Sequence, residues 1–358
     1  MGNEAIQAPV FYADNAFEEL NNYLQRSNPS SLFIIVDSNT QELCLPILLQ
    51  KLQTDVRLEV IEIEPGEEFK NIETCTGIWK VLSELDADRK SLIINLGGGV
   101  VTDLGGFVAA TFKRGIAYIN VPTTLLAMVD ASVGGKTGVD LDNLKNQVGV
   151  ITQPEMVLID TYFLSTLSPA EMRSGLAEIL KHGLISNRVY WKKASRLKDL
   201  TTNDLEEIIK ESVDIKTEVV TRDPLEENLR KTLNFGHTFG HAIESYFLTH
   251  PVKNKLLHGE AVAAGMIIAA FLSNRLLSFP QKDLNEITGI LIDLFPFIDL
   301  EDEDINPIIE LLKYDKKNSH GNINFVLLRS IGDCEIDCRV SENLLIEGLR
   351  YYKSLKNP

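Results

Sequence analysis

The sequence predicts a protein of two domains, an α/β domain with a parallel sheet followed by a mainly α-helical domain. A chain of 358 residues is long enough for about two domains with cores of their own. In its first half, short β-branched runs alternate with helix-like segments, which is typical of nucleotide-binding folds with a parallel sheet. After Pro169 the apolar residues recur with long helical periods. We place the boundary within residues 160–167, which gives domains 1–162 and 163–358.

The individual elements follow from the same patterns. Apolar β-branched runs predict strands, and segments with apolar residues every three or four positions predict helices. The predicted strands cover 31–36, 56–63, 91–96, 118–121, 156–159 and, after the helical half, 324–328. The predicted helices cover 41–52, 74–85, 170–184, 204–220, 240–247 and 259–276. The acidic run 301–304 predicts a solvated helix start, because carboxylates are favoured at the positive end of a helix dipole.

The composition excludes several classes of protein. The chain carries 35 Lys and Arg against 51 Asp and Glu, a net charge of -16, which argues against a general nucleic-acid or anionic-membrane binder. A hydrophobic content of 44% with 24% charged residues excludes a disordered or collagenous chain. An anionic small-molecule substrate therefore requires a local basic pocket.

The cysteines and the start of the chain indicate a cytoplasmic protein. The four cysteines are Cys44, Cys75, Cys334 and Cys338. They show no C-x-x-C spacing, which favours a reducing compartment, and residues 1–6 show no export signal. The longest apolar stretch, 259–272, contains Glu260 and is shorter than the roughly 20 residues that cross a bilayer. It predicts a buried helix.

Two glycine-rich segments are the first candidates for a binding site. The segment 97–106 follows an apolar strand and leads into a helix-like stretch, so its backbone N–H groups can approach a diphosphate closely. Thr102 stands at the third glycine position of the Rossmann fingerprint, and a tight strand-to-helix turn alone is the alternative. The second segment, 133–138, places Lys136 in a similar loop but lacks the spacing of a nucleotide-triphosphate loop. ATP binding is thus disfavoured.

Histidines in the helical half are candidates for a metal site. His237 and His241 are four residues apart and share one helix face. His258 follows, and Glu178 supplies a carboxylate. Three N or O ligands with one open position are what a catalytic zinc site requires, whereas any single histidine can simply cap or pack.

Cations gather around these motifs. Most lysines and arginines of an acidic protein are solvated surface groups, so their nearness to the motifs is the only reason to single them out. They are Arg114, Lys136, Lys145, Lys181, Lys216, Arg230 and the pair Lys316 and Lys317. An anionic substrate would account for them together.

Seven motifs in order resemble those of the 3-dehydroquinate synthase family of sugar-phosphate cyclases. They are GGGVVTDLGGF, KRGIAYINVPTTLLAMVDASVGGKTGV, LKNQVG, SGLAEILKHG, LNFGHTFGHAIE, LHGEAVAAGM and DKKN, between Gly97 and Asn318. The resemblance implies an N-terminal NAD-binding α/β domain and a C-terminal helical metal domain. It also implies an active site in the cleft between them and a homodimer in which Arg114 crosses the interface.

The resemblance also implies roles for individual residues. The metal ligands would be Glu178, His237 and His258, with zinc the usual metal and cobalt possible, and His241 would stay unligated and face the substrate. NAD would be held by Asp37, Asn39, Glu67, Lys70, Gly98, Gly99, Asp103, Thr123 and Thr124, with Asp130, Lys136 and Lys145 shared between cofactor and substrate. The substrate would meet Asn146, Lys181, Lys216, Arg230, Asn234, His241, Lys316 and, across the dimer, Arg114.

Two positions depart from the family pattern. Thr102 stands where many members have glycine, which bears on the diphosphate turn. The 246–257 connection between the two ligand histidines is longer than in relatives, so the assignment of His258 rests on its LHGE context. The resemblance leaves open whether Lys316 or Lys317 reaches the substrate.

The reaction that the resemblance implies begins with 3-deoxy-D-arabino-heptulosonate 7-phosphate. Its carboxylate and phosphate account for the cations. A hydroxyl is oxidised by NAD with the help of the metal, phosphate is eliminated, the hydride returns, and ring opening with aldol closure gives 3-dehydroquinate. The phosphate, held by His241, Asn234, Lys136, Lys181 and Asn146, can itself act as base, and Lys216 and Arg230 would hold the carboxylate. Asp130 is assigned to the nicotinamide side.

Three other functions compete with this one. A polyol dehydrogenase would share the metal, NAD and hydroxyl oxidation, but the cations for phosphate and carboxylate argue against it. A sister sugar-phosphate cyclase would alter positions such as Asn234 and His241, and both are retained. A catalytically silent NAD- or metal-sensing protein could lose the substrate cations, which are all present.

Overall fold

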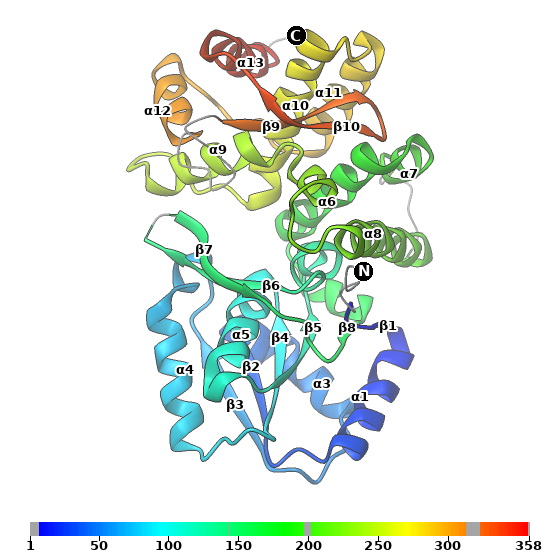
Figure 1. Cartoon of the computed structure of the whole chain (residues 1–358), viewed down its shortest axis with the longest axis vertical. Helices are drawn as coiled ribbons and strands as arrows, with labels where there is room; N and C mark the ends of the chain where they lie inside the picture. Colours follow the sequence, from blue (N-terminus) through cyan, green and yellow to red (C-terminus); the bar gives the residue numbers. More distant parts are fainter. Residues whose placement is uncertain (1–6, 143, 197–201, 313–322, 357–358) are drawn as a thin grey trace. The chain divides into compact units, whose positions relative to one another are not determined.

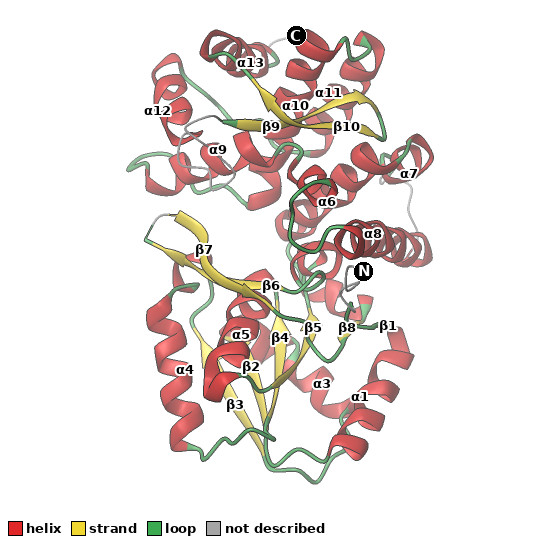
Figure 2. Ribbon diagram, in the orientation of Figure 1, coloured by secondary structure: helices red, strands yellow, loops and turns green. Residues whose placement is uncertain are grey.

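The computed structural model describes residues 7–142, 144–196, 202–312 and 323–356. The chain forms two compact units, Met1–Met172 and Arg173–Pro358, and each is described by itself (Figure 1). The boundary expected from the sequence lies at 162/163, and the structure adds the short helix η4 (Thr161–Thr166) to the first unit. The predicted fold class is confirmed: a parallel sheet with helices in the first unit and mainly helices in the second (Figure 2).

The first unit is built on a parallel sheet with the strand order β1-β8-β5-β4-β2-β3. The strands are β1 (Val10–Tyr12), β2 (Leu32–Asp37), β3 (Leu58–Ile63), β4 (Leu92–Gly97), β5 (Ala117–Pro122) and β8 (Val157–Ile159). Five of them coincide with predicted runs. Strands covered on both faces read as continuous apolar segments, and β2 and β4 are almost wholly buried. The three-residue β1 was not among the predicted runs.

The helices of the first unit follow the strands in the chain. They are α1 (Ala13–Ser27), α2 (Ser38–Leu43), α3 (Leu45–Lys51), η1 (Glu67–Phe69), α4 (Ile72–Glu84), α5 (Gly99–Thr111), η2 (Phe112–Arg114) and the π-helical η3 (Ala127–Ala131). The single helix predicted over 41–52 is wrong. Asp37 and Thr40 form a capping box that starts α2 at Ser38, and Pro46, which lacks an N–H, begins a separate helix after Cys44.

One core cluster joins the sheet to α4 and α5. Phe33 and Ile93 from the sheet, Ile78 from α4, and Val101 and Leu104 from α5 all belong to it and are almost fully buried. Gly105 brings α5 close to β4, because a Cβ at this position would lie 2.0 Å from the side-chain oxygen of Asn95. The start of α5 is therefore fixed rigidly at the end of β4.

A hairpin that the sequence did not predict follows η3. Strands β6 (Lys136–Leu141) and β7 (Leu144–Ile151) pair antiparallel, with an irregularity between Val139 and Leu141. Side chains on both faces of β7 are exposed, so its sequence lacks the alternation of apolar and polar residues that predicts a half-buried strand.

The second unit is mainly helical. Its helices are α6 (Pro169–Ser186), α7 (Arg188–Ala194), α8 (Thr202–Arg222), η6 (Leu229–Asn234), α9 (His237–Thr249), α10 (His258–Leu277), α11 (Gln281–Leu294), α12 (Asp302–Leu312) and α13 (Glu342–Ser354). Strands β9 (Asn324–Ser330) and β10 (Asp333–Arg339) form a hairpin. The predicted helix start in 301–304 is confirmed by α12, but it is not wholly solvated, because Asp304 is buried.

Helix α10 is the centre of this unit. Within the part of the chain that the structure describes, it is the one helix long and apolar enough to cross a membrane, and 72% of its most apolar window is buried. It packs against α9, α11, α13 and β9. The prediction of a buried helix over 259–272 is confirmed.

The connection between α9 and α10 is anchored on α12. The carboxylate of Asp304, which is 0% exposed, accepts hydrogen bonds from Tyr246 Oη and Lys253 Nζ, each at 2.6 Å, and from the Glu301 amide at 2.8 Å. Burial by itself raises the pKa of Asp304, but these hydrogen bonds hold it below its usual range. The long connection that precedes His258 is thereby tied to a buried charge.

We expect Lys253→Met to lower the free energy of unfolding at pH 7 by about 1 to 3 kcal/mol, because the buried carboxylate loses its cation. A depressed pKa contributes stability above the unfolded-state pKa, near 4 for Asp, and that contribution is lost as the pH falls through the folded-state pKa. The difference between wild type and variant should therefore shrink at pH 3.5 in urea unfolding. Lys356→Met, which breaks only the exposed pair with Asp299, is the control. An equal loss at both pH values would contradict the assignment.

Candidate functional site

The first group of predicted site residues lies where strands of the sheet end. Asp37 is the last residue of β2, and Gly98 and Gly99 follow β4, its neighbour in the sheet. The chain goes from β2 outward to β3 and then returns to the other side of β2 for β4. Such a reversal of strand order opens a crevice at the carboxyl ends of the strands, where doubly wound sheets bind nucleotides.

The turn after β4 matches a phosphate-binding turn in its geometry. Gly98 is the N-cap of α5, and a Cβ at Gly98 would lie 2.9 Å from Cγ2 of Thr124. The Thr123 amide donates to the Gly97 carbonyl at 3.0 Å, so the ends of β4 and β5 meet here. Thr102 lies inside α5, where its hydroxyl is 3.2 Å from the Gly98 carbonyl. Thr102 therefore caps a carbonyl in the first turn of α5. The strand-to-helix turn itself consists of Gly97, Gly98 and Gly99.

Five predicted residues meet in one network in the first unit. Lys70 Nζ donates to Asp103 Oδ2 at 2.7 Å and to Asn146 Oδ1 at 2.6 Å, and it lies 3.8 Å from Glu67 Oε1. Lys145 Nζ lies 3.2 Å from the same Glu67 oxygen. Burial by itself lowers the pKa of Lys70, but the surrounding carboxylates raise it above its usual range, so Lys70 is a cation. Lys70 and Asn146, which meet in this network, are 76 positions apart in the sequence.

Asp140 is a member of this network that sequence reasoning missed. Its carboxylate accepts the Asn146 amide at 2.6 Å, and its own amide donates to the Lys70 carbonyl at 2.8 Å. Asn146 has a φ of 52°, a left-handed conformation that this bond supports. An aspartate near a hairpin is common, so the sequence offered no signal for it.

The remaining predicted residues of the first unit are placed individually. Asn39 is exposed in α2, Asp130 is half-buried in η3, and Lys136 is exposed at the start of β6. Arg114 is exposed and has a φ of 70°, and it follows Lys113 with a φ of 49°. Two successive left-handed residues fix a sharp turn that holds the arginine at the surface.

The second unit brings the predicted metal ligands together. Glu178 Oε1 lies 3.3 Å from His237 Nε2 and 3.8 Å from His258 Nε2. Glu178 comes from α6, His237 begins α9 and His258 begins α10. Ligands about 2.1 Å from a tetrahedral zinc ion lie about 3.4 Å apart, so these three atoms are spaced as ligands of one ion.

The chemistry of these groups fits a metal. Glu178 is 0% exposed; its Oε2 forms an ion pair with Lys181, and its Oε1 faces the two imidazoles without a well-formed hydrogen bond. Burial by itself raises the pKa of Glu178, but Lys181 and the two imidazoles hold it well below its usual range. Burial and Lys181 lower the pKa of His237, so the imidazole is neutral at pH 7. An ionised carboxylate beside neutral imidazoles is the form that binds a divalent cation.

His241 lies beside the same cluster. Its ring centroid is 5.3 Å from that of His237 and 5.8 Å from that of His258. Nitrogens of the three histidines lie within 4.8 Å of one another, so they could also hold a metal. The geometry therefore allows two ligand sets, which differ in whether Glu178 or His241 completes the site.

The predicted anion-binding residues of the second unit are largely buried. Lys181, Lys216 and Arg230 are 1%, 7% and 2% exposed. Arg230 Nη1 donates to the Pro224 carbonyl at 2.8 Å, and Asn234 Nδ2 donates to Glu226 Oε1 at 2.7 Å.

Sequence reasoning missed two glutamates of this unit. Glu226 contacts Asn234, and Glu244 Oε2 lies 3.2 Å from His258 Nδ1. Glu244 stands seven residues after His237, and that helical spacing is a signal that could have found it. Lys316 and Lys317 lie outside the described residues.

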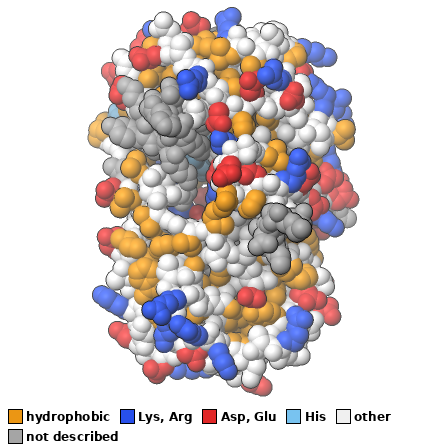
Figure 3. Space-filling model, viewed as in Figure 1, with side chains coloured by type: hydrophobic (Ala, Val, Ile, Leu, Met, Phe, Trp, Pro, Cys, Tyr) orange, Lys and Arg blue, Asp and Glu red, His pale blue; other side chains and the backbone are white. Residues whose placement is uncertain are grey.

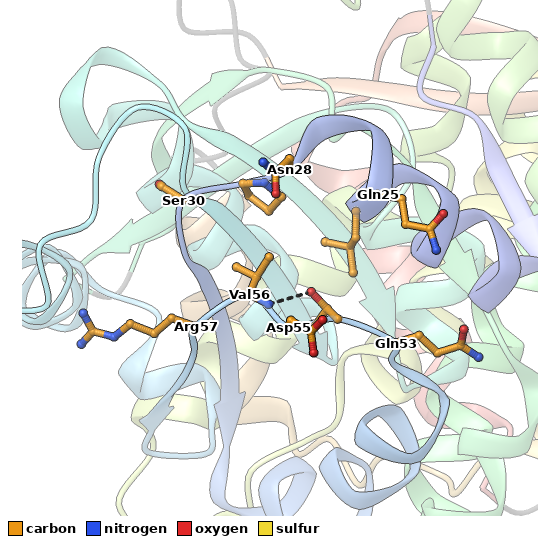
Figure 4. Close-up of a pocket in the computed structure, with 10 residues that line it drawn as sticks. Gln25, Asn28, Ser30, Gln53, Asp55, Val56 and Arg57 are labelled. Carbon is orange, nitrogen blue, oxygen red and sulfur yellow. Dashed lines mark hydrogen bonds between the residues drawn. The ribbon is translucent and has the colours of Figure 1, made fainter.

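Figure 3 shows acidic and basic side chains interspersed on the visible face, which carries no extended basic surface. One groove lies at the amino ends of β2 and β3, opposite the ends that carry Asp37 and Gly98 (Figure 4). It is lined by Leu24, Gln25, Asn28, Pro29, Ser30, Gln53, Thr54, Asp55, Val56 and Arg57. None of these is a predicted site residue.

Comparison with known proteins gives consistent matches along the chain. The family model of the 3-dehydroquinate synthase N-terminal part matches residues 60–174, and that of the C-terminal part matches residues 175–318. A 3-dehydroquinate synthase from Parabacteroides distasonis is 41% identical over 338 residues, which cover 94% of this chain and 95% of the relative.

Two solved structures share the fold over nearly the whole chain. 2-epi-5-epi-valiolone synthase from Streptomyces hygroscopicus subsp. jinggangensis, with NAD+ and Zn2+ bound, is 25% identical with a TM-score of 0.86, and the match covers 100% of this chain and 99% of that one. 2-deoxy-scyllo-inosose synthase, complexed with carbaglucose-6-phosphate, NAD+ and Co2+, is 26% identical with a TM-score of 0.81, and the match covers 97% and 99%.

Proposed function

Because the chain belongs to the 3-dehydroquinate synthase family, we propose that its own residues convert 3-deoxy-D-arabino-heptulosonate 7-phosphate to 3-dehydroquinate and phosphate as follows. The protein is an enzyme of the shikimate pathway, in the lyase class, and it uses NAD and a divalent metal. The observation that carries the proposal is the convergence of Glu178, His237 and His258 in a unit that also buries Lys181, Lys216 and Arg230.

The cofactors supply two kinds of chemistry when bound: NAD accepts and returns a hydride, and a divalent metal, which we propose is zinc, acidifies the hydroxyl that is oxidised. Glu178, His237 and His258 would hold the metal. The turn at Gly98 and Gly99 would hold the dinucleotide, together with Asp37 at the end of β2, Asn39 in α2, and Thr123 and Thr124 after β5.

The cations of the chain would hold the two anionic ends of the substrate. Lys216 and Arg230 bind the carboxylate, and Lys136, Lys181 and Asn146 bind the phosphate. Desolvated cations bind anions more strongly than surface cations do, and Lys181, Lys216 and Arg230 are buried. Lys316 and Arg114 are assigned to the substrate on the family pattern, with Asp130 toward the nicotinamide.

Elimination of phosphate needs a proton to move, and we assign His241 and Asn234 to assist it. His241 can donate a hydrogen bond or a proton to the phosphate, and Asn234 is held by Glu226 so that its amide is oriented. In the first unit, Lys70 donates hydrogen bonds to Asp103 and Asn146. These bonds order the residues next to the turn proposed to hold the dinucleotide. Polar groups that are fixed in place before the reaction stabilise the negative charge that develops on the leaving phosphate.

We also propose a homodimer and a cytoplasmic location. Val148, Val150 and Ile151 expose apolar side chains on β7, and exposed apolar strands are typical of association surfaces. Arg114 is held at the surface by its turn, as a residue that crosses to a partner must be. All four cysteines are free thiols, which supports a reducing compartment.

We expect the enzyme to release phosphate from the heptulosonate phosphate with only catalytic NAD and without lasting NADH, because the hydride returns to the substrate. The measurement is inorganic phosphate by a coupled assay together with absorbance at the NADH band. A control reaction with glycerol should give neither signal. NADH formed in proportion to substrate would overturn the proposal in favour of a polyol dehydrogenase, and phosphate release only from a different sugar phosphate would favour a sister cyclase.

A further inference from the structure

Glu244 is a buried carboxylate that none of the roles above uses. It lies on α9, three residues after His241 and seven after His237, so the three residues share one face of the helix. The side chain is 8% exposed, and its Oε2 lies 3.2 Å from Nδ1 of His258. We propose that Glu244 is a positioning residue that orients His258 as a metal ligand.

The two ring nitrogens of His258 face different carboxylates. Nδ1 approaches Glu244, and Nε2 lies 3.8 Å from Glu178 Oε1. A hydrogen bond from Nδ1 to the Glu244 carboxylate leaves the lone pair of a neutral ring on Nε2. This is the tautomer that presents Nε2 to an ion beside Glu178. A second hydrogen bond of this kind orients a ligand imidazole and raises its basicity.

His258 needs this support more than His237 does. His258 is the first residue of α10, its side chain is 22% exposed, and the connection before it is long. His237 is almost buried, and its Nδ1 lies 3.3 Å from the Phe235 carbonyl, a neutral acceptor only two residues away. The Glu244 carboxylate therefore contacts His258, the more exposed of the two ligand imidazoles.

The distance between Glu244 and His258 is set by backbone packing. A Cβ at Gly240 would lie 3.1 Å from the Cα of Val262, and one at Gly265 would lie 2.0 Å from the Gly236 carbonyl. These glycines let α9 and α10 approach closely, so rotation of either helix is restricted. The helix backbones that carry Glu244 and His258 are thus held at a fixed separation.

The test compares Glu244→Gln, which keeps the size and one acceptor, with Glu244→Ala. The proposal rests on the proposed metal ligands, and zinc affinity measured by chelator competition is its main readout. We expect 10- to 100-fold weaker zinc binding for Glu244→Ala and a smaller loss for Glu244→Gln. Excess zinc should restore kcat in the Gln variant, because the ligands themselves remain. The absorption bands of cobalt-loaded protein should shift in both variants.

Several results would overturn the inference. One is unchanged zinc affinity in the Gln and Ala variants, and another is a loss of kcat that excess zinc does not restore. Weaker zinc binding accompanied by an equal loss of metal-free stability would assign Glu244 to packing alone. If Glu244→Gln fails to fold, Glu244→Asp supplies the same comparison. His258→Ala separates the two proposals: if it loses zinc while the Glu244 variants keep it, only the role of Glu244 fails.

Discussion

Replacing His258 with alanine is expected to abolish both zinc retention and turnover. Its Nε2 lies 3.8 Å from Glu178 Oε1, and its ring centroid is 5.4 Å from that of His237, as expected of ligands to one ion. With two ligands left, the site should lose its ion during purification, because affinity depends on the complete set. Elemental analysis of the purified variant and phosphate release on the same preparation test this expectation.

The matched control is His250→Ala, in the connection that leads to His258. His250 Nδ1 accepts the amides of Val252 and Lys253 at 3.3 and 3.2 Å and is not part of the histidine cluster. This variant should keep its zinc. Full zinc occupancy in the His258→Ala protein would show that the ligand is misassigned, despite its LHGE context.

Replacing His241 with asparagine should leave zinc bound and slow phosphate elimination by a hundred- to thousandfold, about 2.7 to 4 kcal/mol by analogy with the loss of one oxyanion donor. A metal that acts as a Lewis acid needs an open position for substrate oxygens, and a fourth protein ligand would close it. His241 should therefore act on the phosphate. Zinc content and the rate of phosphate release are measured on one preparation.

The contrast with His237→Asn makes this test decisive, because the two histidines lie one turn apart on α9. The His237 variant should lose zinc and activity together. If the His241 variant does the same, then His241 belongs to the metal shell, and the three-histidine set that the spacing also permits is the ligand set.

The sequence by itself was sufficient to predict the features that depend on residues close together in the chain. The apolar runs predicted β2 and β4, since a strand buried on both faces is rich in apolar residues. The glycines after β4 predicted a close turn into α5, and the i, i+4 spacing placed His237 and His241 on one helix face. The break between α2 and α3 escaped prediction, because the capping box at Asp37 and Thr40 competes with the apolar period of 41–52.

Only the tertiary structure decided which distant residues meet. Glu178 reaches His258 because α6, α9 and α10 pack together, and Lys70 reaches Asn146 because the β6–β7 hairpin folds over the segment after β3. The position of Glu244 beside the candidate metal site was recognised only from its contact with His258. Local patterns record the period of a helix or strand, whereas the partner of a side chain depends on which buried faces pack against each other. Many arrangements bury a similar apolar area, so shape complementarity between distant segments selects one of them.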